Sequence, residues 1–264
     1  MNALIILGLL VVLMLTGMPI SISLGLTVLS FLFFLTEVPI ESVALKLFTG
    51  IEKFEIMAIP FFILAGNFLT HGGVAKRMIG FATSMVGHWH GGLGLGGVVA
   101  CALFAAVSGS SPATVVAIGS ILLPAMVKAG FPKSFGAGVI TTSGALGILI
   151  PPSIVMVMYS VSTNTSVGAL FMAGVIPGLL LAFFLGLTTW YRAKKFNYPC
   201  QPKATWAERW VSFRKAIWGL LLIVVVMGGI YTGIFTPTEA AAMSAVYAFV
   251  VAVFVYKDMG LKDV

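Results

Sequence analysis

Ser108-Gly109-Ser110-Ser111-Pro112-Ala113-Thr114 is the stretch that decides the fold of this chain. These small or polar residues lie between two apolar arms, residues 93–107 and 115–127. Each arm rises about 20 Å as a helix, whereas the hydrocarbon core of a bilayer is about 30 Å thick. One arm is too short to span a membrane, and the two joined are too long. We predict a re-entrant helical hairpin; two tilted spans with a tight turn, or one kinked helix, are the alternatives.

The tip of this hairpin is also the first candidate functional site. Irregular backbone at mid-membrane is tolerated only where it is buried in protein or lines a cavity. The tip would bring hydroxyl groups and unpaired backbone atoms to that depth. Residues 108–114 are therefore a predicted ion or substrate site.

The composition places the whole chain in a membrane. Of its 264 residues, 59% are hydrophobic and 9% are charged, whereas soluble domains carry about 25% charged residues. We therefore predict an all-α polytopic membrane protein. The net charge of +7 does not indicate a nucleic-acid partner, because the basic residues form no stripe interleaved with stacking aromatics.

The basic residues gather instead in one loop, residues 192–215, where they greatly outnumber the single Glu208. An excess of Lys and Arg marks a cytoplasmic loop. Counting spans back from it places both ends of the hairpin in the cytoplasm and the N-terminus outside. Thr205 and Glu208 have the spacing of a capping box that would open a short helix carrying Trp206, Trp210 and Trp218.

Apolar segments predict the other helices. Residues 37–55 carry charges of both signs and read as an interfacial connection, and residues 72–90 are amphipathic and would lie along the membrane surface. Thr236-Pro237-Thr238-Glu239 reads as a capped helix start, which gives Glu239 a structural role. The predicted apolar segments are 3–17, 20–35, 56–70, 134–160, 167–190, 217–234 and 238–256.

The segment 134–160 is predicted to be broken in its middle. Pro151 and Pro152 lack backbone donors and free the carbonyls before them, while Gly144 and Gly147 allow close backbone approach. The hydroxyls of this region belong to Thr141, Thr142, Ser143 and Ser153. A polar hairpin tip facing an unwound helix is how discontinuous-helix transporters build a midplane site, although Pro-Pro can also merely kink a packing helix.

The absence of carboxylates narrows the chemistry. The sequence has no Asp or Glu between Glu55 and Glu208. Proton relays in membranes rest on buried carboxylates or His, and divalent cations normally take carboxylate ligands. Neutral hydroxyl and carbonyl oxygens favour Na⁺ as the coupling ion. Helix N-termini near 112–115 and 152–154 would favour an anionic substrate.

Several other patterns fail their context tests. Residues 92–97 match GxGxxG, but no strand precedes them, so close helix packing is the better interpretation. His88-Trp89-His90 lacks a third ligand, and no CxxC-type pattern exists, so we expect no transition-metal site and no cofactor. Ser110 has no His at membrane depth to activate it, so we expect no enzyme.

Four stretches together carry a resemblance to a known family. They are "AIPFFILAGNFLTHGG" (58–73), "SGSSPATVVAIGSILLPAM" (108–126), "GALGILIPPSIVMVMY" (144–159) and "GGIYTGIFTPTEAAAMSAVYAF" (228–249). The chain resembles the large membrane subunit of tripartite ATP-independent periplasmic (TRAP) transporters, the DctM family.

The resemblance implies a sodium-coupled importer of organic anions such as dicarboxylates, sialic acids, keto acids or sugar acids, working by an elevator mechanism in a bacterial or archaeal inner membrane. It implies a small membrane subunit (DctQ-like) and a periplasmic substrate-binding protein (DctP-like) as partners. It also implies that the hairpin and the broken helix form one sodium site. The site residues so implied are Ser108, Gly109, Ser110, Ser111, Thr114, Gly144, Gly147, Pro151, Pro152 and Ser153.

The resemblance also organises the chain into parts. These are the N-terminal helices of the scaffold and the start of the transport domain (1–71), a cytoplasmic-surface helix (72–91), a transport-domain core (92–165), a span with the basic arm (166–215) and the start of a second inverted repeat (216–264). Family members continue through that second repeat, whereas this sequence stops at Val264. We therefore expect a C-terminally truncated chain. The alternative is a non-transporting scaffold or half-transporter that needs a second chain.

Overall fold

The computed structural model describes residues 2–36, 39, 45, 48–50 and 52–260. It divides into two compact units, Met1–Glu52 and Lys53–Val264. In the first unit, α1 (Asn2–Leu15) and α2 (Ile20–Leu35) pack on each other across a turn in which Gly17 has a φ of +81°. Both predicted N-terminal helices are thus confirmed. Glu37, Glu41 and Lys46 of the predicted interfacial connection lie outside the described residues.

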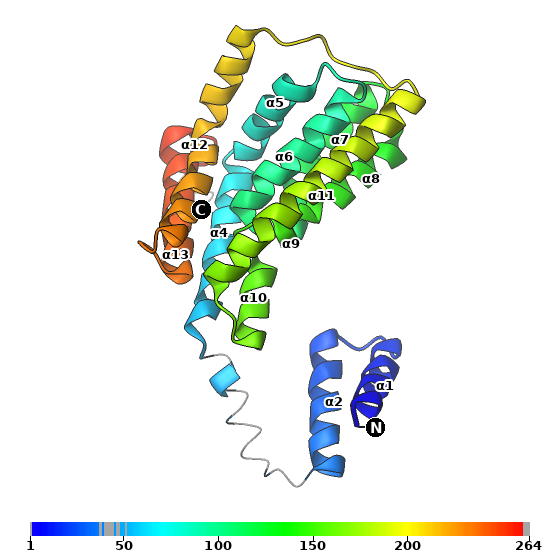
Figure 1. The fold of residues 1–264 in the computed structure, drawn as a ribbon, viewed down its shortest axis with the longest axis vertical. Helices are drawn as coiled ribbons and strands as arrows, with labels where there is room; N and C mark the ends of the chain where they lie inside the picture. The colour runs from blue at the N-terminus through cyan, green and yellow to red at the C-terminus, as the bar shows by residue number, and fades with distance from the viewer. Residues whose placement is uncertain (1, 37–38, 40–44, 46–47, 51, 261–264) are drawn as a thin grey trace. The chain divides into compact units, whose positions relative to one another are not determined.

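The second unit is helical throughout its described residues (Figure 1). Its elements are η1 (Phe54–Met57), α4 (Ala58–His71), α5 (Val74–Val86), α6 (Gly92–Ser108), α7 (Ser111–Lys128), α8 (Lys133–Gly144), α9 (Leu146–Leu149), α10 (Ile154–Thr163), α11 (Val167–Lys195), α12 (Trp206–Tyr231), α13 (Pro237–Val250) and the π-helical η2 (Val251–Val255). Among the described residues, five helices are long and apolar enough to cross a membrane, and a bent pair makes a sixth candidate span. This is the predicted all-α polytopic architecture.

Helix α6 forms the centre of this unit and is buried along nearly its whole length. It contacts α4, α5, α7, α8, α9, α11 and α12. Its glycines make this possible: a Cβ on Gly97 would meet Leu122 of α7 at 2.5 Å, and one on Gly96 would meet Thr83 of α5 at 2.9 Å. The glycine run 92–97 is therefore a close-packing surface, as predicted.

Helices α6 and α7 form an antiparallel hairpin, because Gly97 near the start of α6 lies against Leu122 near the end of α7. The turn contains only Gly109, with φ +61°, and Ser110. The arms hold 17 and 18 residues and rise about 26 and 27 Å. The predicted arms of about 20 Å were too short, because the tip residues Ser108 and Ser111 are themselves helical. At its full length α7 is one of the candidate spans, so the length argument for a re-entrant hairpin was wrong and the re-entrant course stays a prediction.

The broken span is also confirmed. Helices α8 and α9 run from Lys133 to Leu149, and α10 leaves the break at an angle of 42°. Pro151 and Pro152, which are joined by a cis peptide bond, lie in the non-helical stretch between them.

Two predicted boundaries around the basic loop were wrong. Helix α11 continues to Lys195, so the connection to the next helix is only residues 196–205. The capping box of Thr205 and Glu208 is confirmed, but it opens one continuous helix of 26 residues and not a short helix before a separate span. Residues 206–218 contain no proline or glycine. The tryptophans and basic residues of this stretch therefore belong to the same helix as the apolar residues that follow them.

The amphipathic segment 72–90 does form a helix, α5. Its apolar face, which includes Val74, Met78 and Ala82, is buried against α6 and α12. Arg77 forms an ion pair with Asp258 and lies 3.8 Å from the ring centroid of Tyr256. The helix is thus fixed to the bundle along one side; its place at the membrane surface remains a prediction.

Candidate functional site

The hairpin tip is a compact network of hydroxyl groups. Ser110 caps α7, its Oγ accepting a hydrogen bond from the Ala113 amide at 3.5 Å. Thr114 Oγ1 donates to the Ser110 carbonyl at 2.8 Å and lies 3.0 Å from Ser108 Oγ. Ser108 Oγ also lies 3.4 Å from the Ser110 carbonyl, so the two hydroxyls share one acceptor and either can be the donor in the contact between them. The side chains of Ser108 and Thr114 are fully buried.

The break in the following span repeats this local structure. Ser153 caps α10, and its Oγ accepts from the Met156 amide at 3.5 Å. The backbone angles of Ser153 (φ −133°, ψ 128°) are nearly those of Ser110 (φ −133°, ψ 123°). The two prolines before Ser153 have no N–H, so the carbonyls of Gly147 and Ile148 receive no helical hydrogen bond from them.

The tip and the break lie against each other. The Ile154 amide donates a 3.0 Å hydrogen bond to the Gly109 carbonyl. A Cβ on Gly147 would lie 2.8 Å from the backbone of Ser110 and Ser111, and one on Gly109 would lie 2.8 Å from the Pro152 carbonyl oxygen. All ten sequence-predicted site residues therefore fall in one region of the fold; Gly144 joins it through Val115 and the Ser111 carbonyl.

The buried oxygens of this region are all neutral. Ser108, Thr114, Ser143 and Ser153 are each inaccessible to solvent. Ser143 Oγ has no hydrogen-bond partner among the described residues. Buried hydroxyls are normally paired, so an unpaired one calls for a ligand or a water. By contrast, Thr141 and Thr142 are exposed, and Thr142 bonds the Gly138 carbonyl of its own helix.

Three glycines on other helices complete the region, and sequence reasoning did not single them out. A Cβ added to Gly66 of α4 would lie 3.4 Å from the Cβ of Ser108. On α11, a Cβ at Gly174 would lie 2.6 Å from the Leu149 carbonyl oxygen, and one at Gly178 would lie 2.8 Å from Ile150. Gly66 sits within a stretch quoted for the resemblance. Gly174 and Gly178 have the G-x-x-x-G spacing that is typical of a close-packing face on a membrane helix, and this signal could have found them.

The described residues contain no group of three metal-ligating His, Cys, Asp or Glu side chains. The chemistry available at the tip and break is that of hydroxyls, carbonyl oxygens and two capped helix N-termini. Such oxygens suit a monovalent cation, and the N-termini suit an anion.

Comparison with known proteins identifies the chain's relatives. A model of the family "Tripartite ATP-independent periplasmic transporter, DctM component" matches residues 7–264. The chain belongs to the DctM family. It is 76% identical to the C4-dicarboxylate TRAP transporter large permease protein DctM of Rhodobacter capsulatus, over 100% of the chain and 63% of that protein. It is 55% identical to the protein of the same name from Vibrio cholerae, over 94% of the chain and 55% of that protein.

A more distant relative is named for another substrate. The 2,3-diketo-L-gulonate TRAP transporter large permease of Escherichia coli is 41% identical, over 92% of the chain and 57% of that protein. The chain thus spans somewhat more than half the length of the curated relatives it matches. The relatives that match the chain are named as large permease proteins of transporters and not as enzymes.

Proposed function

We propose that this chain forms part of the large permease of a sodium-coupled C4-dicarboxylate importer, and that the hairpin tip and the helix break hold the coupling Na⁺. The observation that carries the proposal is the contact between two serine-capped helix starts, fixed by the hydrogen bond from Ile154 to Gly109. The relatives at 76% and 55% identity supply the substrate class, since they are named for C4-dicarboxylates.

Sodium is favoured over the proton by the side chains around the tip. The fully buried hydroxyls of Ser108, Ser143 and Ser153 carry no charge and do not titrate. Nothing in this set could carry a proton at physiological pH in the way that a buried carboxylate does. Ser143, next to Gly144, has the unpaired hydroxyl, and a cation bound here would give that hydroxyl a partner.

The dicarboxylate would bind beside the same two helix starts. The N-termini of α7 and α10 each place a partial positive charge near the tip. In discontinuous-helix transporters such half-helix N-termini point at anionic substrate groups. The remaining contacts to the substrate belong to the rest of the permease, since the relatives extend beyond the matched region.

The packing of the site suits an elevator mechanism. Close contacts at Gly109, Gly144 and Gly147 join the hairpin and the broken span into one packed body. Such a body could serve as a transport domain that moves as a unit against α12 and its neighbours. We place the permease in the inner membrane with the basic residues around 192–215 in the cytoplasm. A small membrane subunit and a periplasmic substrate-binding protein complete the tripartite system.

Sodium-dependent protection of a cysteine at the tip tests this proposal. Ser110→Cys is introduced into a Cys200→Ser background, because Cys200 is exposed and Cys101 is buried. Labelling by a small maleimide is followed in native membranes at constant ionic strength, with Na⁺ exchanged for K⁺. We expect Na⁺ to slow labelling, and a C4-dicarboxylate to slow it further only when Na⁺ is present.

Ser162→Cys is the matched control, because Ser162 is an exposed serine on α10 that bonds only the carbonyl of Met158. Its labelling should be the same in Na⁺ and K⁺. Equal labelling of Ser110→Cys in the two salts would refute a sodium site at the tip.

A further inference from the structure

A large apolar groove lies between α6 and α11, and none of the ten predicted site residues lines it. Its volume is about 850 Å³, within the range of about 300–1,000 Å³ typical of sites that hold small molecules. Small residues leave it open: Ala102 faces it from α6, and Ala182 and Gly186 from α11. Apart from the groups at one end, the other residues of its walls are Leu, Val and Phe, whose side chains are hydrocarbon.

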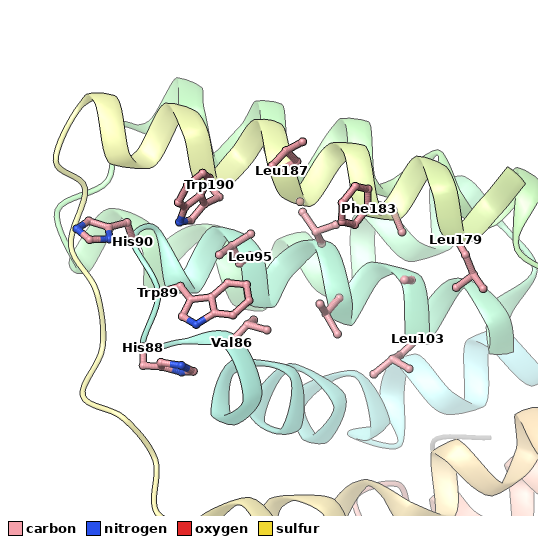
Figure 2. A pocket seen from close by; sticks show the side chains of 15 residues that line it. Val86, His88, Trp89, His90, Leu95, Leu103, Leu179, Phe183, Leu187 and Trp190 are labelled. Carbon is pink, nitrogen blue, oxygen red and sulfur yellow. The ribbon is translucent and has the colours of Figure 1, made fainter. Parts of the chain in front are cut away.

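The two ends of the groove differ in chemistry. Leu103 and Leu179 lie at one end, and His88, Trp89, His90 and Trp190 gather at the other (Figure 2). Tryptophan is typical of the membrane–water interface, where its ring meets both hydrocarbon and headgroups. Nδ1 of His88 is buried without a hydrogen-bond partner among the described residues.

The same end carries an excess of positive charge. Gly91 packs on Ala193, which brings the last turn of α11 beside the histidines. That turn contains Arg192, Lys194 and Lys195, all of them exposed. The Lys194 ammonium lies 5.2 Å from the ring centroid of Trp190, which is itself a wall of the groove.

We infer that this groove binds an anionic phospholipid, with its acyl chains along α6 and α11 and its phosphate at Lys194. The apolar walls match hydrocarbon, the Trp pair matches the depth of the glycerol backbone, and the basic turn matches the phosphate charge. Basic pockets between transmembrane helices on the cytoplasmic side are typical sites for anionic headgroups.

The length of the groove suits the acyl chains of a lipid. From Leu179 to Trp190 α11 rises about 17 Å. That is close to half of the roughly 30 Å hydrocarbon core, which is the depth of one leaflet. Acyl chains that start beside the tryptophans would therefore follow the groove to its end at Leu179.

Native mass spectrometry of the intact protein, extracted from its membrane into mild detergent, tests the inference. The protein is titrated with phosphatidylglycerol and, separately, with phosphatidylcholine. We expect one phosphatidylglycerol to be retained in preference to phosphatidylcholine. Ala102→Phe/Ala182→Phe fills the groove and should weaken retention about tenfold or more. Ala173→Phe, on an exposed position of α11 outside the groove, should change nothing.

The headgroup contact is tested separately. Lys194→Gln should reduce the preference for phosphatidylglycerol, whereas Lys128→Gln, at the exposed end of α7, should not. A second experiment does not depend on the folding of the filled variant. A photo-crosslinking benzophenone side chain is placed at position 182, and it should capture phospholipid. The inference is overturned if the filled groove retains phosphatidylglycerol as well as the wild type, if the two lipids bind equally, or if position 182 captures a polypeptide.

Discussion

The amide of Ile154 donates a 3.0 Å hydrogen bond to the carbonyl of Gly109, so the first residue of α10 is bonded to the tip of the hairpin. This bond joins two chain breaks that are each opened by a serine cap, at Ser110 and Ser153. Because both helix starts point into one buried region, a shift of either element changes the oxygens that the other presents. The predictions below follow from this coupling.

Enlarging Gly147 should separate the two elements. A side chain there would press on the Ser110 and Ser111 backbone, with atoms only 2.8 Å from its Cβ. We expect Gly147→Val to lower the free energy of unfolding by about 1–3 kcal/mol and to abolish sodium-dependent protection of the tip. Gly138→Val is the control on the neighbouring helix α8, where a Cβ meets nothing within 4 Å. Thermal unfolding in detergent measures both; equal stability of the two variants would contradict the packing described here.

Replacing Ser143 distinguishes a ligand role of its unpaired hydroxyl from a structural role. Ser143→Ala removes a buried group without a partner, so stability without sodium should be unchanged or slightly higher. Sodium affinity should nevertheless fall about tenfold, or about 1.4 kcal/mol. Ser160→Ala should behave in the opposite way, because Ser160 Oγ donates to the Thr165 carbonyl and lies outside the site. An unchanged sodium affinity in Ser143→Ala would remove this residue from the site.

The glycines of α11 should matter to the site although they contribute no side chain. A Cβ at Gly174 would lie 2.6 Å from the Leu149 carbonyl oxygen and 2.4 Å from Met156 Cε. We expect Gly174→Ala to displace the break and weaken sodium binding. Gly168→Ala, on the same helix, meets only ordinary contacts at 3.8 Å and should leave binding intact. Sodium titrations of the two purified variants compare them, and matching affinities would count against a role for α11.

The capping box of α12 should contribute to the stability of the fold but not to sodium binding. Thr205 Oγ1 accepts a bond from the Glu208 amide, and the Glu208 carboxylate accepts from the Thr205 amide at 2.7 Å. Thr205→Ala should lower stability by about 1 kcal/mol. Thr188→Ala, which removes a hydroxyl bonded within its own helix, should cost less. Sodium affinity should be the same in both; a loss in Thr205→Ala alone would tie this cap to the site.

The features that local sequence predicts correctly are those with a local cause. The tip, the break and the caps at Thr205 and Thr236 each follow from residues within a few positions of one another, because caps and proline breaks act over a single turn. The glycine run of α6 was also correctly read as a packing surface, although its partners Thr83 and Leu122 lie on other helices, because closely spaced glycines allow close approach whichever helix packs on them.

The features that escaped prediction depend on distant partners or on the lack of a break. Nothing near Gly174 or Gly178 indicates that Leu149 and Ile150 will lie on them. We predicted a short helix and a separate span where α12 is one helix, because the charge pattern changes near residue 217. A helix continues through such a change when no residue stops it. The hairpin arms were drawn too short because Ser and Thr were assigned to the turn, whereas Ser108, Ser111 and Thr114 take helical positions beside it.

Sodium binding by the wild-type protein is the most direct test of the central claim. Its thermal unfolding is followed while Na⁺ replaces K⁺ at constant ionic strength. A site at the tip and the break predicts saturable stabilisation, about 2.7 kcal/mol at one hundred times the dissociation constant, which Ser143→Ala shifts to higher sodium. Identical unfolding in Na⁺ and K⁺ at every concentration would contradict the account.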